Sequence, residues 1–205
     1  MSASPSGEKA KAGRITLAHL QKLKRDGERI TMVACYDATG AAVVENAGVE
    51  IILVGDSLGM LVQGAESTLS VSMEDSVYHT RCVAKGAKRA VVLGDMPFGS
   101  YQESPQQAFA NAAKLMAAGS HMIKLEGGAL MAETVAFLSA RGIPVCGHLG
   151  LTPQSVNALG GYKVQGKTVD GAQRVIDDAK ALEAAGAVMI VLEAIPTALG
   201  KAVTE

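Results

Sequence analysis

The 205-residue sequence lacks a long hydrophobic run and an excess of either charge, and each absence excludes a class of protein. No apolar stretch approaches the roughly 20 residues that a membrane-spanning helix needs, although 48% of the residues are hydrophobic. The 19 basic and 20 acidic residues give a net charge of -1, which argues against a nucleic-acid partner because such a partner favours a basic face. We therefore expect a soluble cytoplasmic protein whose partners are small molecules.

The sequence also lacks paired cysteines and a secretory signal. Its three cysteines, Cys35, Cys82 and Cys146, are widely separated and form no CxxC motif, which fits reduced thiols that fill apolar space. The first residues, MSASPSGEKAKAG, are small and polar with no apolar stretch behind them. We expect a flexible arm over residues 1–15 and one domain over residues 16–205, because no linker-like stretch divides the rest.

Short β-type runs alternate with amphipathic helical stretches along the chain. We expect strands at 29–36, 50–55, 89–95, 121–126, 144–149 and 188–194. We expect helices at 17–27, 39–48, 73–87, 104–119, 130–142 and 171–187. Glycines stand where helix C-caps are needed, at Gly48, Gly86, Gly119, Gly142 and Gly186. This rhythm predicts a parallel sheet covered by helices, either doubly wound or closed as a barrel, with its site at the carboxyl ends of the strands.

Two aspartates stand at the ends of predicted strands. Asp56 and Asp95 would project from neighbouring strand ends into one cavity, and such a pair suits Mg²⁺, which takes few protein ligands and keeps water in its shell. The alternative for Asp56 and Ser57 is a helix N-cap, because both residue types favour that position. Asp37 has a similar placement, but helix-forming residues follow it at once and favour capping.

Charged residues also mark the ends of three later strands. Lys124 and Glu126 lie on one side of a strand, where they could bind a substrate carboxylate and a metal-bound water, or form an internal ion pair. Glu193 lies among apolar residues, so we expect poor solvation that raises its pKa towards that of a general base. His148 could polarise a substrate carbonyl or be a hydrogen-bonded core residue.

The segment GYKVQGKT, from Gly161 to Thr168, matches the P-loop pattern of nucleotide hydrolases. A phosphate cradle needs a β-strand that leads directly into it, and the preceding TPQSVNALG is polar and contains proline. A nucleotide hydrolase is therefore the weaker alternative.

Six longer segments occur in order between Thr16 and the last residue: VGDSLGM, STLSVSMEDSVYHT, LGDMPFGSY, IKLEGG, VCGHLGLTPQSVNALGGYKVQGK and LEAIP. Together they resemble the ketopantoate hydroxymethyltransferase family. The resemblance implies a (βα)8 TIM barrel of the phosphoenolpyruvate/pyruvate type, assembled as a homodecamer that acts in pantothenate and coenzyme A synthesis. It also implies transfer of the one-carbon unit of 5,10-methylenetetrahydrofolate to 3-methyl-2-oxobutanoate, which gives 2-dehydropantoate and tetrahydrofolate.

The same resemblance implies a role for each matching residue. These are Asp56 and Asp95 as Mg²⁺ ligands, Glu126 as the acid that bonds a metal-bound water, Ser57 and Lys124 as substrate contacts, Glu193 as the base, and His148 within the GHLGLTPQSVN signature. In the implied mechanism the 2-oxo acid chelates Mg²⁺ and Asp95 lies at that chelate. The metal stabilises the enolate that forms when Glu193 takes the C3 proton, and this enolate attacks the folate-bound carbon.

Related chains continue with two further βα units, so we expect the natural protein to be longer and six strands to leave a barrel unclosed. Two other functions stay open. A Mg²⁺-dependent lyase or mutase of 2-oxo acids could use the same fold, although the expected KKCGH-like cysteine loop is absent. A non-catalytic interaction module would leave the strand-end acids unexplained.

Overall fold

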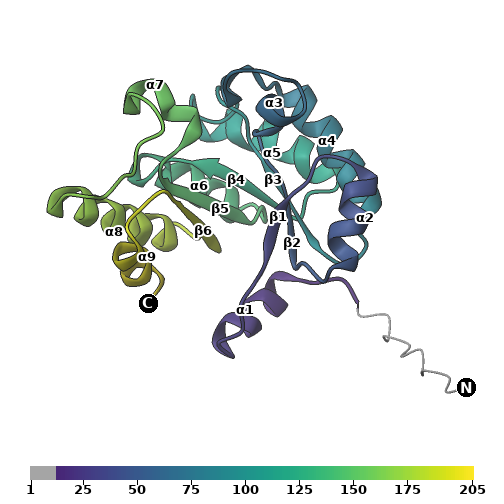
Figure 1. The fold of residues 1–205 in the computed structure, drawn as a ribbon, viewed down its shortest axis with the longest axis horizontal. Helices are drawn as coiled ribbons and strands as arrows, with labels where there is room; N and C mark the ends of the chain where they lie inside the picture. Colours follow the sequence, from purple (N-terminus) through teal and green to yellow (C-terminus); the bar gives the residue numbers. More distant parts are fainter. Residues whose placement is uncertain (1–12) are drawn as a thin grey trace, which may run out of the picture.

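Six parallel strands form the centre of the protein in a computed structural model that describes residues 13–205 (Figure 1). They are β1 (Met32–Ala34), β2 (Ile51–Val54), β3 (Val91–Asp95), β4 (Met122–Glu126), β5 (Val145–Gly150) and β6 (Met189–Glu193). Each strand pairs in parallel with the next one along the chain. All six predicted strands are confirmed, and their order is the simple βα succession that the sequence predicts.

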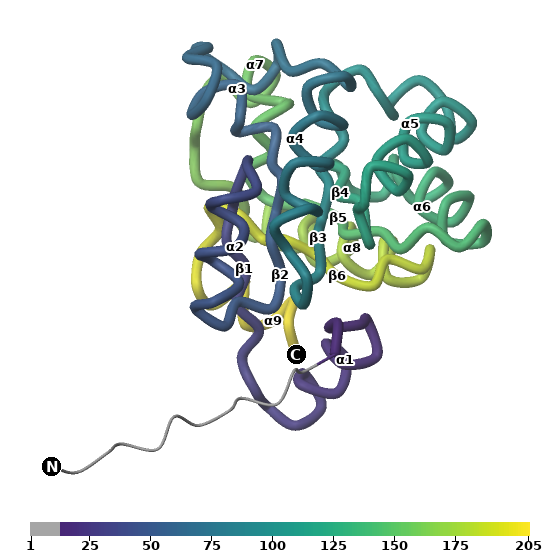
Figure 2. The backbone as a smooth tube through the Cα atoms, turned by 90° about the vertical axis from the view of Figure 1, so that its right-hand side faces the viewer, coloured from purple at the N-terminus to yellow at the C-terminus, as the bar shows by residue number. Residues whose placement is uncertain are grey.

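Helices connect the strands and cover the sheet. The longer ones are α1 (Leu17–Arg25), α2 (Ala38–Asn46), α4 (Met73–Gly86), α5 (Pro105–Ala118), α6 (Ala132–Ser139), α8 (Val169–Ala184) and α9 (Thr197–Thr204). Short turns of helix are α3 (Leu58–Leu61), α7 (Val156–Leu159), η1 (Thr68–Ser70), η2 (Ala129–Met131) and η3 (Pro153–Ser155). Both views place α3 and α7 beyond the carboxyl ends of the strands, with α1 at the opposite end (Figures 1 and 2). The six predicted helices are confirmed.

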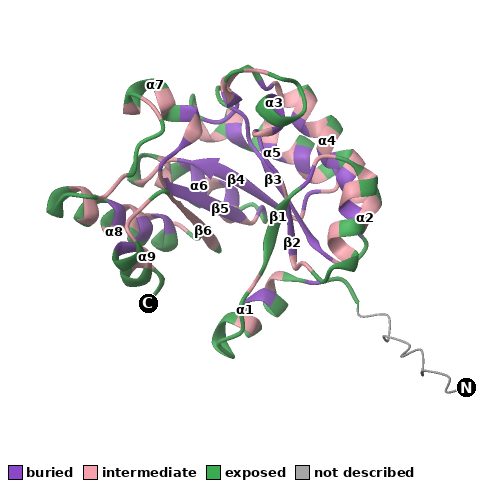
Figure 3. Ribbon diagram, in the orientation of Figure 1, coloured by how far each residue is buried: buried purple, intermediate pink, exposed green. Residues whose placement is uncertain are grey.

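Burial is greatest in the middle of the sheet. Every residue of β3 and β4 is buried, as are nearly all of β2 and β5, because helices cover the central strands (Figure 3). In contrast, β1 is exposed along its length and β6 is only partly buried. Among the described residues, β1 and β6 each have one neighbour, so the six strands form an open sheet, as expected.

Helix ends follow the sequence predictions with one exception. The Asp37 side chain caps α2 by accepting a hydrogen bond of 2.7 Å from the Gly40 amide, which confirms its structural role. Four of the five predicted capping glycines have positive φ. Gly86 does not, because α4 ends at this residue and Ala87 follows in an extended conformation. Gly86 is needed for a different reason, since a Cβ atom there would lie 2.1 Å from the Ala38 carbonyl oxygen.

Replacing Gly86 with alanine is expected to destabilise the protein by about 1–3 kcal/mol, because the added methyl group would push α4 away from α2. This overpacking outweighs the higher helix propensity of alanine, which is worth at most about 1 kcal/mol. Urea denaturation measures the change. The matched control is Gly200→Ala in α9, where the nearest atom to the new Cβ would be 3.7 Å away and stability should be unchanged or higher. Equal stability of the two variants would contradict the packing argument.

Glu50 joins the starts of the two N-terminal strands. Its carboxylate accepts hydrogen bonds from the Thr31 amide at 2.8 Å and the Thr31 hydroxyl at 2.6 Å. Partial burial favours the protonated acid, but these two bonds outweigh it and lower the pKa of Glu50. The backbone before β1 is thereby fixed to the backbone before β2.

Because the pKa of Glu50 is lower in the folded chain, its contribution to stability is present above the unfolded value and is lost as pH falls through the folded value. We expect Glu50→Gln to destabilise the protein by less than about 1 kcal/mol at pH 7, since the bonds are near the surface, and by less still as pH falls towards 3. Urea midpoints of both proteins from pH 3 to pH 7 test this. A difference that does not change with pH would contradict it.

The N-terminal arm predicted over residues 1–15 lies mostly outside the described residues. Its last residue, Ile15, is buried, and its amide donates a hydrogen bond of 2.8 Å to the Arg89 carbonyl oxygen. Cys35 and Cys146 are buried free thiols as expected, whereas Cys82 is only partly buried. None of the helices in residues 13–205 combines the length and the apolar character needed to cross a bilayer.

Candidate active site

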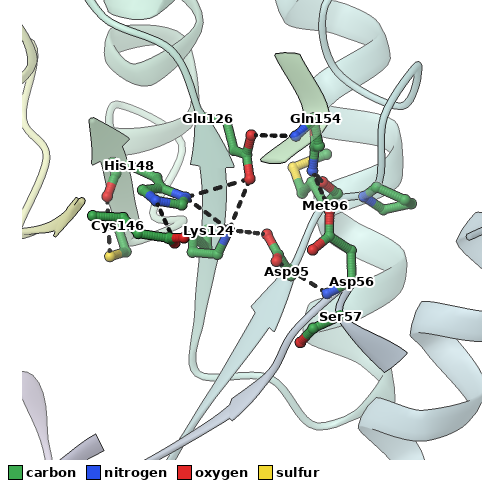
Figure 4. Close-up of polar contacts among 12 residues, drawn as sticks. Asp56, Ser57, Asp95, Met96, Lys124, Glu126, Cys146, His148 and Gln154 are labelled. Atoms are coloured by element: carbon green, nitrogen blue, oxygen red, sulfur yellow. Dashed lines mark hydrogen bonds and ion pairs between the residues drawn. The ribbon is translucent and has the colours of Figure 1, made fainter. Parts of the chain in front are cut away.

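The sheet register brings four charged or polar side chains together. Asp95 at the end of β3 is level with Lys124 on β4, and Glu126 two residues later is level with His148 on β5. Side chains of residues that are level, and of residues two apart in one strand, lie on the same face of a parallel sheet. All four are at most 5% exposed (Figure 4). The strand pattern therefore creates a buried polar cluster at the carboxyl ends of the strands.

Lys124 is the central cation of this cluster. Its Nζ lies 2.7 Å from Asp95 Oδ1 and 3.6 Å from Glu126 Oε1. Burial favours the neutral amine, but the charges of Asp95, Glu126 and Asp56 outweigh it and raise the pKa of Lys124. The internal ion pair that the sequence left open is thus present, and Lys124 is held as a buried cation.

Asp56 and Asp95 are the two acids that were predicted to share a metal. The Asp56 amide donates a hydrogen bond of 3.1 Å to Asp95 Oδ2, so the two residues are in direct contact. Burial, with the nearby charge of Asp56, raises the pKa of Asp95 to about 7. Burial likewise raises the pKa of Asp56. Two adjacent acids with raised pKa values indicate a place that an additional positive charge would stabilise.

These residues fit a hard cation that takes two protein carboxylates. Asp56 and Asp95 supply the carboxylate oxygens that Mg²⁺ prefers, and Asp95 Oδ1 is buried with the Lys124 ammonium as its partner. In the described part of the chain, no group of three or more His, Cys, Asp or Glu residues could hold a metal ion together. A Mg²⁺ ion held by Asp56 and Asp95 would complete its shell with water and substrate oxygens.

Ser57 follows Asp56 at the start of α3. It occupies the N-cap position but makes no capping hydrogen bond with its side chain. Its Oγ lies 2.8 Å from the Tyr36 hydroxyl instead. The capping alternative is therefore wrong for Ser57, and its hydroxyl is paired instead with Tyr36, which follows β1.

His148 lies between two carboxylates. Its Nδ1 is 3.3 Å from Glu126 Oε1, and its Nε2 is 3.3 Å from Glu193 Oε2. Burial favours the neutral ring, but hydrogen bonding to Glu126 and Glu193 outweighs it and raises the pKa of His148. In turn, burial favours the neutral form of Glu126, but His148 and Lys124 outweigh it and lower the pKa of Glu126. His148 thus connects the buried cluster to Glu193 and stabilises the ionised form of Glu126.

Glu193 is less buried than its apolar neighbours predicted. Its side chain is 45% exposed, because β6 has a single neighbouring strand among the described residues and is only partly covered. The expectation of a desolvated carboxylate is wrong. The next residue, Ala194, has φ of 46° and is the one residue other than glycine in 13–205 with positive φ. Such strain is typical of functional positions, and it turns the chain sharply just after Glu193.

Gln154 and Tyr101 are two site residues that the sequence did not single out. Gln154 is 5% exposed, and its Nε2 donates a hydrogen bond of 2.8 Å to Asp56 Oδ2 (Figure 4). The Tyr101 hydroxyl is buried beside it and lies 2.7 Å from Gln154 Oε1. Both occur within segments that carry the family resemblance, LGDMPFGSY and GHLGLTPQSVN, but neither is a charged residue at a strand end.

Two other regions do not form part of this cluster. The segment Gly161 to Thr168 follows α7 rather than a strand, so it lacks the strand–loop–helix geometry of a P-loop. A groove of about 480 Å³ between α1 and the β6–α8–α9 region contains none of the predicted site residues. Only the carboxyl ends of the strands bring the predicted residues together.

The open parallel sheet covered by helices makes this an α/β protein with the arrangement of a partial barrel, and solved structures share this fold. A solved 2,3-dimethylmalate lyase, described as a member of the PEP mutase/isocitrate lyase superfamily, is similar with a TM-score of 0.67 over 91% of this chain and 66% of its own, at 14% identity. The solved complex of a phosphonopyruvate hydrolase with oxalate and Mg²⁺ is similar with a TM-score of 0.65, over 87% of this chain and 62% of the hydrolase, at 17% identity. This chain therefore spans about two thirds of each solved structure.

Residues 14–205 match the family ketopantoate hydroxymethyltransferase, and the chain belongs to that family. It is 61% identical over 192 residues to 3-methyl-2-oxobutanoate hydroxymethyltransferase of Chromobacterium violaceum, which covers 94% of this chain and 73% of that protein. It is 59% identical to the 3-methyl-2-oxobutanoate hydroxymethyltransferase of Neisseria gonorrhoeae, in an alignment that covers 93% of this chain and 72% of that protein. The resemblance found in the sequence motifs is confirmed.

Proposed function

We propose that this chain binds 3-methyl-2-oxobutanoate with Mg²⁺, forms its enolate, and transfers to it the one-carbon unit of 5,10-methylenetetrahydrofolate. The observation that carries the proposal is the buried cluster in which Asp56, Asp95, Lys124 and Glu126 lie beside His148 and Glu193. The products are 2-dehydropantoate and tetrahydrofolate, and one water molecule balances the reaction. The activity in the names of its close relatives supports the same assignment.

Substrate binding follows from the charges in the cluster. Lys124 offers its cation to the substrate carboxylate, and the Ser57 hydroxyl fixes the position of the 2-oxo acid. Asp56 and Asp95 would hold Mg²⁺, which when bound stabilises negative charge on the keto oxygen of the substrate. Glu126 accepts a hydrogen bond from a water molecule beside the aspartates. The similar phosphonopyruvate hydrolase was solved with oxalate and Mg²⁺, a small dianion and the same metal.

Proton transfer is the role of Glu193. We assign it as the base that takes the C3 proton, because its carboxylate lies at the rim of the cluster and is 45% exposed to an incoming substrate. His148 Nε2 lies 3.3 Å from Glu193 Oε2, which holds the carboxylate in place. The resulting enolate attacks the one-carbon unit through C3. The base and the one-carbon unit must both be held close to C3, so their orientation matters.

The complete assembly is also part of the proposal. We infer a (βα)8 barrel, since the chain follows the βα order of such barrels and its relatives are longer. We further infer a homodecamer, as in the family resemblance. The folate would lie at the carboxyl ends of the strands, where α3 and α7 border the site (Figure 2).

The first test is exchange of the C3 hydrogen of 3-methyl-2-oxobutanoate in deuterium oxide, followed by NMR with Mg²⁺ or with a chelator. It should use this chain and a version extended to the length of the Chromobacterium violaceum relative. We expect exchange that depends on Mg²⁺, and 2-dehydropantoate once 5,10-methylenetetrahydrofolate is added. Absence of exchange by the folded, extended protein would overturn the proposal.

A further inference from the structure

Gln154 connects the two halves of the candidate active site. Its side-chain Nε2 donates hydrogen bonds to Asp56 Oδ2 at 2.8 Å and to the Met96 carbonyl oxygen at 2.9 Å. Its backbone amide donates a hydrogen bond to Glu126 Oε2 at 3.0 Å. One residue thus holds both a predicted metal ligand and the acid expected to bond a metal-bound water. Gln154 follows β5 in the chain. Asp56 follows β2, and Glu126 is the last residue of β4.

Tyr101 sets the orientation of the Gln154 side chain. The Tyr101 hydroxyl accepts a hydrogen bond of 3.0 Å from the Glu126 amide, so its own hydrogen is free to be donated to Gln154 Oε1 at 2.7 Å. If the side-chain amide of Gln154 were rotated by half a turn, its Oε1 would face Asp56 Oδ2 and the Met96 carbonyl oxygen. Both are acceptors, so neither could form a hydrogen bond with it. The bonds therefore run in one direction, from Glu126 through Tyr101 and Gln154 to Asp56.

This arrangement is closed to solvent and would be costly to disturb. Tyr101 is 1% exposed and Gln154 is 5% exposed, and both Nε2 hydrogens of Gln154 have acceptors within the protein. A buried polar side chain that is fully hydrogen-bonded has one favoured position, so its partners are held in position too. The bond from Gln154 to Asp56 Oδ2 thus fixes the orientation of the Asp56 carboxylate.

We infer that Gln154 and Tyr101 are positioning residues, which hold Asp56 and Glu126 in the geometry that binds the divalent cation of the site. The inference rests on the proposed function for its role in the reaction, but the hydrogen bonds that carry it do not depend on which 2-oxo acid is bound. Partners that orient metal ligands affect metal binding strongly, since their loss lowers affinity by roughly 10–100-fold.

The test is the affinity for Mn²⁺, a probe for the Mg²⁺ site, measured from the electron paramagnetic resonance signal of the free ion. Gln154→Met keeps the length of the side chain and removes its hydrogen bonds, so we expect Mn²⁺ to bind about 10–100-fold more weakly. Tyr101→Phe removes one oxygen and should weaken binding in the same direction by a smaller factor. Gln173→Met is the matched control, because Gln173 also donates to an aspartate, Asp177, but on the exposed face of α8.

Each outcome decides the inference. Wild-type affinity in folded Gln154→Met, or no Mn²⁺ binding by the wild-type chain, would overturn it. If Gln154→Met does not fold, as judged by circular dichroism in a chelator, Tyr101→Phe decides instead. A positioning role also predicts that excess Mn²⁺ partly restores C3 exchange in Gln154→Met. If the folded, extended wild-type protein shows no exchange but the variants bind Mn²⁺ more weakly, the proposed function fails and this inference stands.

Discussion

Replacing Glu193 with glutamine is expected to slow hydrogen–deuterium exchange at C3 of 3-methyl-2-oxobutanoate by about 10²–10⁴-fold, the usual contribution of a general base. Glutamine has the same shape but cannot accept the proton. The Glu193 side chain is 45% exposed and in contact with His148, so the substitution should leave the fold and the buried cluster intact. NMR measures the exchange rate, and the affinity for Mn²⁺ should stay within about twofold of wild type, because Glu193 is not a predicted metal ligand.

Glu183→Gln on α8 is a suitable control for this variant, since Glu183 is an exposed glutamate outside the site cluster. Exchange should be unchanged there. If Glu193→Gln exchanged the C3 hydrogen at the wild-type rate, the base would have to be another residue. His148 would then be the first candidate, because its Nε2 lies at the same rim of the cluster.

Alternation of apolar strands with glycine-capped helices was enough to predict every strand, because each central strand is buried on both faces and so has a largely apolar sequence. The same pattern could not identify the role of Gly86. A C-cap glycine and a close-packed glycine look alike in the sequence, and only the distance between α2 and α4 separates them. Nor could it predict the exposure of Glu193, which depends on what lies beside β6 rather than on its own neighbours in the chain.

The strand-end acids were predictable because period-two alternation and sheet register follow directly from backbone geometry. Lys124 and Glu126 share a face for this reason, and Asp95 and His148 join them as register partners. Gln154 was not predictable, since it comes from a 3₁₀ turn after β5 and its contact with Asp56 joins residues 98 apart. A neutral residue in a loop gives no charge or periodicity signal, so only the fold reveals that it holds two acids.

Lys124 has the largest expected effect on stability, and replacing it with methionine should destabilise the metal-free protein by about 3–5 kcal/mol at pH 7. Its side chain is 5% exposed and forms ion pairs with Asp95 and Glu126. Methionine fills a similar volume, but it leaves three buried carboxylates, including Asp56, without a cation. The loss therefore comes from uncompensated charge rather than from a cavity. Urea denaturation in the presence of a chelator measures it, with exposed Lys180→Met on α8 as the control.

Two further measurements separate this electrostatic cause from poor packing. In Lys124→Met the carboxyl pKa values should rise further, so the buried acids can take up protons and the deficit should shrink as pH falls from 8 to 5. Adding Mg²⁺ should reduce the deficit too, because a cation bound by Asp56 and Asp95 would replace part of the lost charge. A deficit that changes with neither pH nor Mg²⁺ would mean that Lys124 stabilises the fold through packing alone, and its assigned interaction with a substrate carboxylate would lose its electrostatic basis.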